Sequence, residues 1–227
     1  MCGRYSVGKT ATELAEELDA SLATDAIKPR FNVAPTQQAP MLVALPDRRL
    51  GLARFGWSLR NKKGLLLNAR SETAQSNGLF RSALERRRSL MPADGFYEWR
   101  ALGEGKKAPK QAYFLHAGGD VITFAGLYHV EKKEEEPKDD EPSPITKQAS
   151  FVILTTAASE AIRRVHDRMP IIVPPELRSA WLDVSQPVDG LLRALMARDP
   201  QLALREVGSR VGSPANDDSS LQDPASD

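Results

Sequence analysis

The chain holds one cysteine, and it stands at position 2, directly after the initiator methionine. If Met1 is removed, as is usual ahead of a small residue, Cys2 becomes the N-terminal residue and carries a thiol and an α-amine on adjacent carbons. An α-amine has a pKa of about 8, so an appreciable fraction is unprotonated at neutral pH and can attack a carbonyl. The thiol can then add to the resulting imine and close a five-membered thiazolidine, for which an aldehyde is the natural partner.

Two other residues could move the protons that imine formation requires. Glu98 lies in GFYEW and His166 lies in VHDRMP. A nearby cation such as Arg4 would lower the pKa of the thiol. Each residue also has an ordinary structural interpretation, because an isolated histidine is more often hydrogen-bonded in a structural role and a strand-end glutamate often pairs with an arginine.

Polar side chains alternate in LNARSET, residues 67–73. In an extended segment Asn68, Arg70 and Glu72 would share one face. The pattern Asn-x-Arg is weak by itself, and a cysteine is commonly a small buried hydrophobic residue. None of these residues indicates a functional site by itself, and only their combination does.

The same residues allow three functions. The first is aldehyde capture by Cys2. The second is acyl transfer, in which the Cys2 thiol is the nucleophile and its own amine is the base, as in a thiol peptidase or amidohydrolase. The third is noncovalent binding of a partner, in which Cys2 takes no part.

The charge of the chain is unevenly distributed. The formal net charge is +1. The run 131–141 holds seven acids and three bases, and the segment 213–227 holds four acids and no base. The remaining body keeps 28 bases and 19 acids, about nine positive charges in excess. Such a body is compatible with a polyanionic partner.

Composition excludes several other classes. No apolar run approaches the roughly 18 residues of a membrane span, and no signal peptide is visible. A single cysteine cannot form an internal disulfide, which fits the reducing cytoplasm. With one cysteine and three scattered histidines we expect no metal site.

The elements that must position these residues are short strands that do not alternate regularly with helices. Thr10 and Glu13 have capping-box spacing and predict a helix over 10–20. Segments 41–45 and 50–57 are predicted to pair, as are 112–116 and 121–130 through the AGGD turn. Residues 150–158 form the strongest predicted strand.

We therefore expect one α+β domain over residues 1–212 with a curved, largely antiparallel, barrel-like sheet flanked by helices. The acidic segment 131–147 is expected to be a solvated loop. The polar segment 213–227 is expected to be a disordered tail.

Seven motifs in order resemble the SOS-response-associated peptidase (SRAP) family, and together they are far more specific than any one of them. They are MCGRY at the start, RFNVAPTQ (30–37), LNARSET (67–73), MPADGFYEW (91–99), TTAAS (155–159), VHDRMP (165–170) and RVGSPANDD (210–218).

The resemblance implies a monomeric cytoplasmic protein, associated with the nucleoid when bound, that recognises abasic sites in single-stranded DNA without a cofactor. Its N-terminal cysteine would crosslink to the ring-opened sugar as a thiazolidine and shield the lesion. The family name also implies a peptidase that removes its own first residue.

Carried over residue by residue, the resemblance makes Cys2 the crosslinking residue, Asn68 the residue that positions it, Glu98 the acid–base group and His166 the group that assists ring opening. The cations expected to contact phosphates are Arg4, Arg70 and Arg168. Thr155 and Asn216 fall in motifs near the site.

The sequence departs from the family between the FGW and NAR motifs. The family usually has a longer loop here, with an additional aromatic residue that helps to splay the DNA. In FGWSLRNKKGLLLNAR, Trp57 and the basic residues Arg60, Lys62 and Lys63 stand in its place as expected DNA contacts.

Overall fold

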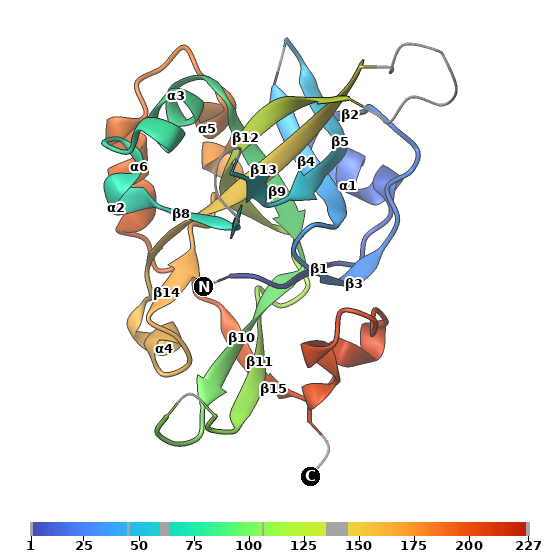
Figure 1. The fold of residues 1–227 in the computed structure, drawn as a ribbon, viewed down its shortest axis with the longest axis vertical. Helices are drawn as coiled ribbons and strands as arrows, with labels where there is room; N and C mark the ends of the chain where they lie inside the picture. Colours follow the sequence, from blue (N-terminus) through green and yellow to red (C-terminus); the bar gives the residue numbers. More distant parts are fainter. Residues whose placement is uncertain (1, 45, 60–63, 106, 135–144, 226–227) are drawn as a thin grey trace.

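The computed structural model describes residues 2–44, 46–59, 64–105, 107–134 and 145–225 (Figure 1). The strands are β1 (Tyr5–Val7), β2 (Ser21–Leu22), β3 (Arg30–Val33), β4 (Gln38–Ala44), β5 (Arg48–Phe55), β6 (Trp57–Ser58), β7 (Leu65–Leu66), β8 (Asn68–Arg70), β9 (Arg88–Ala93), β10 (Gly95–Ala101), β11 (Lys110–His116), β12 (Ile122–Glu134), β13 (Ile145–Ala157), β14 (Arg168–Pro170) and β15 (Ala203–Val207). The helices are α1 (Ala11–Glu17), α2 (Ser71–Ala74), α3 (Gly78–Arg86), α4 (Glu160–Arg163), α5 (Arg178–Leu182) and α6 (Asp189–Met196), with 3-10 turns η1 (Pro175–Leu177), η2 (Ser209–Gly212) and η3 (Ser219–Gln222).

Within the described residues, β13, β12, β9, β4 and β5 form a closed ring. Neighbouring strands pair antiparallel around it, and the final pair, β5 with β13, is parallel. At this closing pair Phe55 stands opposite Phe151, and their rings stack with centroids 5.2 Å apart. Closure leaves the ring without free edges. The expected α+β class with a barrel-like sheet is confirmed.

A second sheet carries the start of the chain, with the strand order β15-β11-β10-β1-β3. The chain passes from the barrel to the second sheet at Asp94, where it turns from β9 into β10. The Asp94 carboxylate fixes this turn by accepting hydrogen bonds from the Ser6 hydroxyl at 2.8 Å and the Gly8 N–H at 2.6 Å. The turn thus ties β10 to β1.

Several local predictions are confirmed. The Thr10–Glu13 capping box begins α1, and β4 pairs with β5 in the expected hairpin. The expected second hairpin is wrong. β11 pairs with β10 and β15, whereas β12 pairs with β9 and β13, so the AGGD turn joins two sheets. Here tertiary pairing overrides the local turn signal.

The two polar segments also differ from expectation. Residues 131–134 and 145–147 were expected in a solvated loop, but they extend the paired strands β12 and β13 as far as Glu134 opposite Ile145. Residues 213–225, expected to be disordered, fold against the domain, and Leu221 there is 3% exposed. The structure describes no helix long and apolar enough to cross a membrane.

Gly95 marks where β10 needs a residue without a side chain. A Cβ at this position would lie 2.3 Å from the Leu115 carbonyl oxygen and 2.7 Å from the Phe114 ring. Backbone cannot yield as a flexible side chain can, so we expect Gly95→Ala to lower the free energy of unfolding by about 3 kcal/mol, as measured by urea denaturation.

The matched control is Gly190→Ala in α6, where a Cβ would meet nothing within 4 Å. Alanine is favoured over glycine in a helix by about 1 kcal/mol, so this variant should be at least as stable as wild type. Equal stabilities for the two variants would contradict the close approach at Gly95.

Candidate functional site

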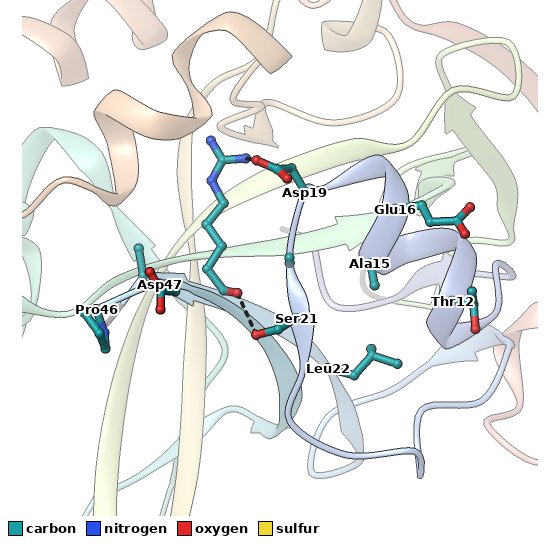
Figure 2. Close-up of a pocket in the computed structure, with 11 residues that line it drawn as sticks. Thr12, Ala15, Glu16, Asp19, Ser21, Leu22, Pro46 and Asp47 are labelled. Carbon is teal, nitrogen blue, oxygen red and sulfur yellow. Dashed lines mark hydrogen bonds and ion pairs between the residues drawn. The ribbon is translucent and has the colours of Figure 1, made fainter.

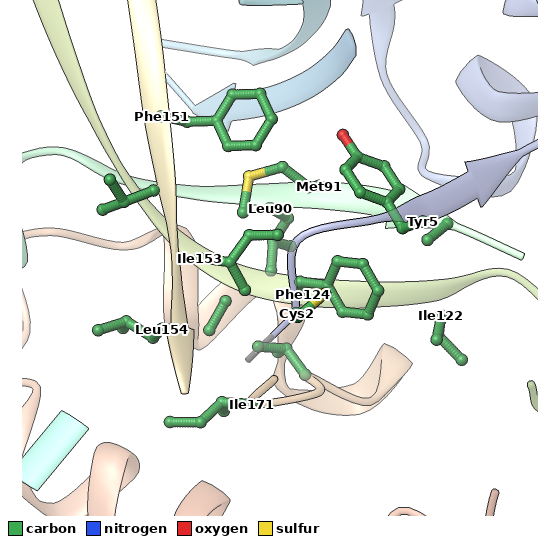
Figure 3. Close-up of a cluster of buried hydrophobic side chains, with 14 of the residues drawn as sticks. Cys2, Tyr5, Leu90, Met91, Ile122, Phe124, Phe151, Ile153, Leu154 and Ile171 are labelled. Atoms are coloured by element: carbon green, nitrogen blue, oxygen red, sulfur yellow. The ribbon is translucent and has the colours of Figure 1, made fainter. Parts of the chain in front are cut away.

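Cys2 is buried at the edge of the main hydrophobic core (Figure 3), with 0% of the residue exposed. Burial raises the pKa of its thiol far above the ordinary value, and the negative charge of Glu98 raises it further. A hydrogen bond from the Arg4 backbone N–H offsets only part of this rise. Arg4 thus lowers the pKa of the thiol as expected, although it does so through its backbone N–H; burial outweighs this effect, so the thiol is neutral at physiological pH in this arrangement.

Asn68 is brought to Cys2 by the strand that carries it. β8 pairs parallel with β13, with Asn68 opposite Ile153. From this position the Asn68 side-chain amide donates a hydrogen bond to the Cys2 carbonyl oxygen at 3.0 Å. The contact holds the backbone of Cys2 while leaving its thiol and amine free of that bond.

Glu98 reaches Cys2 from the opposite side through the second sheet. β10 pairs antiparallel with β1, with Phe96 opposite Tyr5, and the Tyr97 N–H donates to the Arg4 carbonyl at 2.9 Å. Glu98 is 3% exposed, and its charge acts on the Cys2 thiol. A buried carboxylate beside the N-terminal strand is placed to exchange protons there.

His166 lies on the connection between α4 and β14. Its Nδ1 accepts a hydrogen bond from the Arg168 backbone N–H at 3.0 Å and lies 2.9 Å from a carboxylate oxygen of Asp167. The Ala158 N–H, just beyond β13, donates to the Asp167 carbonyl at 2.9 Å. The imidazole is therefore anchored to the end of β13, the strand that also pairs with β8.

Arg168 is held in place by a side chain that our sequence analysis did not assign to the site. Its two terminal nitrogens donate to the Glu72 carboxylate at 2.6 and 2.8 Å, and one also donates to the Thr155 carbonyl at 2.6 Å. The hydrogen bond from Arg168 lowers the pKa of Glu72. Thr155 is fully buried, and its carbonyl also accepts from the Ser71 hydroxyl.

Glu72 could have been suspected from its alternation with Asn68 and Arg70. In the structure that alternation ends at Arg70, because α2 begins at Ser71. Glu72 reaches Arg168 from the first turn of this helix instead. The pairing between strands far apart in sequence creates the contact.

The remaining residues expected to contact DNA differ from one another in their exposure to solvent. Arg70 is exposed at the end of β8. Trp57 is only 5% exposed; its indole N–H donates to the Ser150 carbonyl at 3.0 Å and its ring packs on Phe80. Its expected contact with DNA is wrong for this arrangement, because α3 covers the ring. The positions expected to add phosphate contacts, Arg60, Lys62 and Lys63, lie outside the described residues.

Arg4 and Asn216 both belong to contacts that join the two ends of the chain. The Arg4 guanidinium donates to the Val211 and Gly212 carbonyls at 2.8 and 3.0 Å. The Asn216 carbonyl accepts from the Asn32 side chain at 2.8 Å. Both residues are thus engaged within the protein.

Other possible sites do not coincide with this one. A cavity of about 910 Å³ lies between α1 and the β4–β5 turn (Figure 2), and none of the predicted site residues lines it. Among the residues that the structure describes, no group of three or more His, Cys, Asp or Glu side chains could hold a metal ion.

Fold and site together define an α+β protein in which Cys2, near the start of the chain, lies between β8, which pairs with the barrel strand β13, and a second sheet. A family model described as SOS response associated peptidase (SRAP) matches residues 1–214. The abasic site processing protein YoqW of Bacillus subtilis is 31% identical over 233 residues, which cover 97% of this chain and 98% of YoqW. The abasic site processing protein YedK of Escherichia coli is 30% identical over 192 residues, covering 80% and 79%.

Two solved structures have a similar fold. A crystal structure of a Bacteroides thetaiotaomicron protein matches with a TM-score of 0.80 at 18% identity, covering 99% of this chain and 100% of that one, and shows the same fold. A phage-related protein from Bordetella bronchiseptica matches with a TM-score of 0.69 at 29% identity, covering 91% and 94%. This chain belongs to the SRAP family.

The influence of Glu98 on the thiol can be tested without any substrate. Glu98→Gln removes a negative charge that opposes thiolate formation, so we expect the pKa of Cys2 to fall and the pH profile of alkylation by iodoacetamide to move to lower pH. Burial is the larger cause of the raised pKa, so the profile should stay above that of an exposed cysteine.

Glu104→Gln is the matched control, because Glu104 is an exposed carboxylate on the turn that follows β10. Its alkylation profile should equal that of wild type. A Glu98→Gln profile that also equals wild type would show that this carboxylate does not act on Cys2.

Proposed function

We propose that this protein recognises abasic sites in single-stranded DNA and becomes covalently attached to them through Cys2 after removal of Met1. The observation that carries the proposal is the placement of Cys2 between the Asn68 amide and the Glu98 carboxylate. An abasic sugar in its ring-opened form supplies the aldehyde that an amine and a thiol on adjacent carbons can capture. The crosslink would shield the lesion during the DNA-damage response.

The reaction proceeds in two bond-forming steps. The α-amine of Cys2 adds to the C1′ aldehyde, and loss of one water gives an imine. The thiol then adds to the imine carbon while its proton passes to the nitrogen, which closes the thiazolidine. The aldehyde, the amine and the thiol thus give one ring and one water.

The side chains of the site have distinct roles in these steps. Glu98 relays protons during addition and water loss, because it lies buried beside Cys2. His166, 27% exposed at its side chain, assists opening of the sugar ring. Asn68 orients Cys2 through its carbonyl. Arg70, which is exposed, contacts phosphates around the lesion, whereas the terminal nitrogens of Arg168 are already engaged by Glu72 and Thr155.

The state of the thiol supports this order of steps. A neutral, buried thiol is a poor first nucleophile, because the thiolate is the reactive form. An unprotonated α-amine carries no such restriction. Burial, the largest cause of the raised pKa of Cys2 in the chain that carries Met1, therefore fits attack by the amine first and addition of the thiol to an already activated imine.

Thiol peptidase activity, including removal of Met1 by the protein itself, is a second candidate because the matching family is described as a peptidase. It uses Cys2 as an acyl-transfer nucleophile with its own amine as base. Repeated turnover of an amide by wild type, lost in Cys2→Ser, would favour it.

The principal test mixes the protein with a single-stranded oligonucleotide that bears one abasic site. We expect a covalent band on a denaturing gel, whose intact mass equals protein lacking Met1 plus DNA minus one water. Cys2→Ala keeps an α-amine but no thiol, so it should give only an imine, which reverses unless it is reduced with borohydride.

A variant with one extra residue ahead of Cys2 is the control, because its thiol is present but its α-amine lies on another residue. This variant should give no crosslink. Crosslinking at the wild-type rate by this variant would show that the thiazolidine mechanism is wrong. If wild type lacking Met1 gave no band, amide substrates would be screened instead.

The exposed Arg70 provides a separate test of DNA binding. If it contacts one phosphate, Arg70→Ala should weaken binding about equally for intact oligonucleotides of different sequence. The slope of log K against log salt should fall in magnitude by about 0.7. Fluorescence anisotropy at several salt concentrations measures both quantities.

Arg193→Ala is the matched control, because Arg193 is an exposed arginine on α6. It should leave both the affinity and the salt slope unchanged. The same loss in both variants would indicate a general charge effect rather than a phosphate contact at Arg70.

A further inference from the structure

The second residue of a chain has few neighbours in sequence to hold it. Cys2 must nevertheless keep its position beside Asn68 and Glu98. Chain ends are usually poorly ordered unless other segments tie them down. Here the residue that ties the end down is Arg4. Its backbone N–H bonds the Cys2 sulfur, and its carbonyl accepts from the Tyr97 N–H, next to Glu98.

The side chain of Arg4 extends in the other direction, toward the C-terminal segment. One terminal nitrogen donates to the Asn32 side-chain oxygen at 2.7 Å and to the Val211 carbonyl at 2.8 Å. The other donates to the Gly212 carbonyl at 3.0 Å. These three acceptors engage both terminal nitrogens and take three of the five N–H groups of the guanidinium.

Asn32 is fully buried and fixes the acceptors of Arg4. Its amide nitrogen lies within hydrogen-bond distance of the Val211, Ser213 and Asn216 carbonyls, at 3.2, 3.0 and 2.8 Å. The Asn32 side chain therefore holds the turn at 211–216 through its amide nitrogen and accepts a hydrogen bond from Arg4 through its amide oxygen.

Asp217 anchors this turn to β3. One carboxylate oxygen accepts from the backbone N–H groups of Phe31 and Asn32 at 2.6 and 2.8 Å, and the other pairs with the Arg30 side chain. Hydrogen bonds to a charged group are stronger than those between neutral groups. Asp217 thus adds a charged link between the C-terminal segment and β3, the strand that carries Asn32.

We propose that Asp217 and Asn32 are positioning residues for Cys2, acting through Arg4, so that the segment 211–217 holds the nucleophile in place. The inference rests on the proposed function for its effect on crosslinking, but its geometric claim stands independently. It assigns Arg4 an internal role in place of the phosphate contact that our sequence analysis expected.

The two roles of Arg4 predict different kinetics in single-turnover crosslinking. If Arg4 positions Cys2, Arg4→Lys should lower the rate at saturating DNA and leave the half-saturating concentration within about twofold of wild type, because a lysine lacks the fork of donors. If Arg4 contacts a phosphate, lysine should largely replace it.

The same assay tests Asp217, with protein whose loss of Met1 is confirmed by intact mass. Asp217→Ala should lower the rate at saturating DNA by about tenfold or more, since small misplacements of a reacting group carry large rate penalties. Asp217→Asn keeps an oxygen for the two backbone N–H groups, so its rate should lie between those of Asp217→Ala and wild type.

Alkylation of Cys2 by iodoacetamide provides a readout without DNA. Loosening of the N-terminal strand should expose the thiol and speed its alkylation by about tenfold in Asp217→Ala, the factor expected from losing one or two buried hydrogen bonds. Crosslinking should thus fall while alkylation rises, a pair of opposite changes that weaker DNA binding would not produce.

Asp223→Asn is the matched control, since Asp223 is an exposed acid of the polar C-terminal segment 213–227. It should equal wild type in both assays. The proposal is overturned if folded Asp217→Ala or Asp217→Asn, with a wild-type circular dichroism spectrum, matches wild type in both rates. If wild type itself forms no crosslink, the proposed function fails, and alkylation alone decides the positioning role.

Discussion

The site depends on the backbone hydrogen bonding of one strand, β13. One edge of β13 is covered by β12 as far as Ile153 and then by β14 from Thr155, while the other edge is covered by β5 and then by β8. Backbone donors and acceptors in a buried strand must find partners. Satisfying them brings Asn68 on β8 and Arg168 on β14 to the same stretch of β13 and closes the barrel with the Phe55–Phe151 stack.

Burial gives the site its chemical character. Cys2 and Glu98 are both nearly inaccessible, so a charge on either is felt strongly by the other. A thiol in such surroundings stays protonated and inert toward most electrophiles. In the proposed reaction the first attack then depends on the α-amine, which exists at Cys2 only when nothing precedes that residue. The arrangement thus couples the chemistry of the site to N-terminal processing.

The parts of the fold with local causes were predictable. The Thr10–Glu13 box, the β4–β5 hairpin and the apolar run of β13 follow from neighbouring residues. The parallel closure of the barrel and the change of sheet at AGGD depend on partners distant in sequence. The segment 213–225 was misjudged because its composition is polar, yet Asp217 uses its charge to bind β3. Cys2 was identified from its position in the chain, and Asn68 and Glu98 were given their roles by the family resemblance. The parts played by Glu72, Asn32 and Asp217 needed the structure.

The contact between Arg4 and Val211 spans 207 residues of chain. A contact of such separation closes a very long loop and carries a large closure entropy, so it forms late in folding. On the ribosome the partner of Arg4 emerges only after nearly all of the chain has been synthesised. Cys2 is therefore synthesised first but is fixed beside Asn68 and Glu98 only after the C-terminal segment has folded, so an incomplete nascent chain carries the cysteine without the complete site.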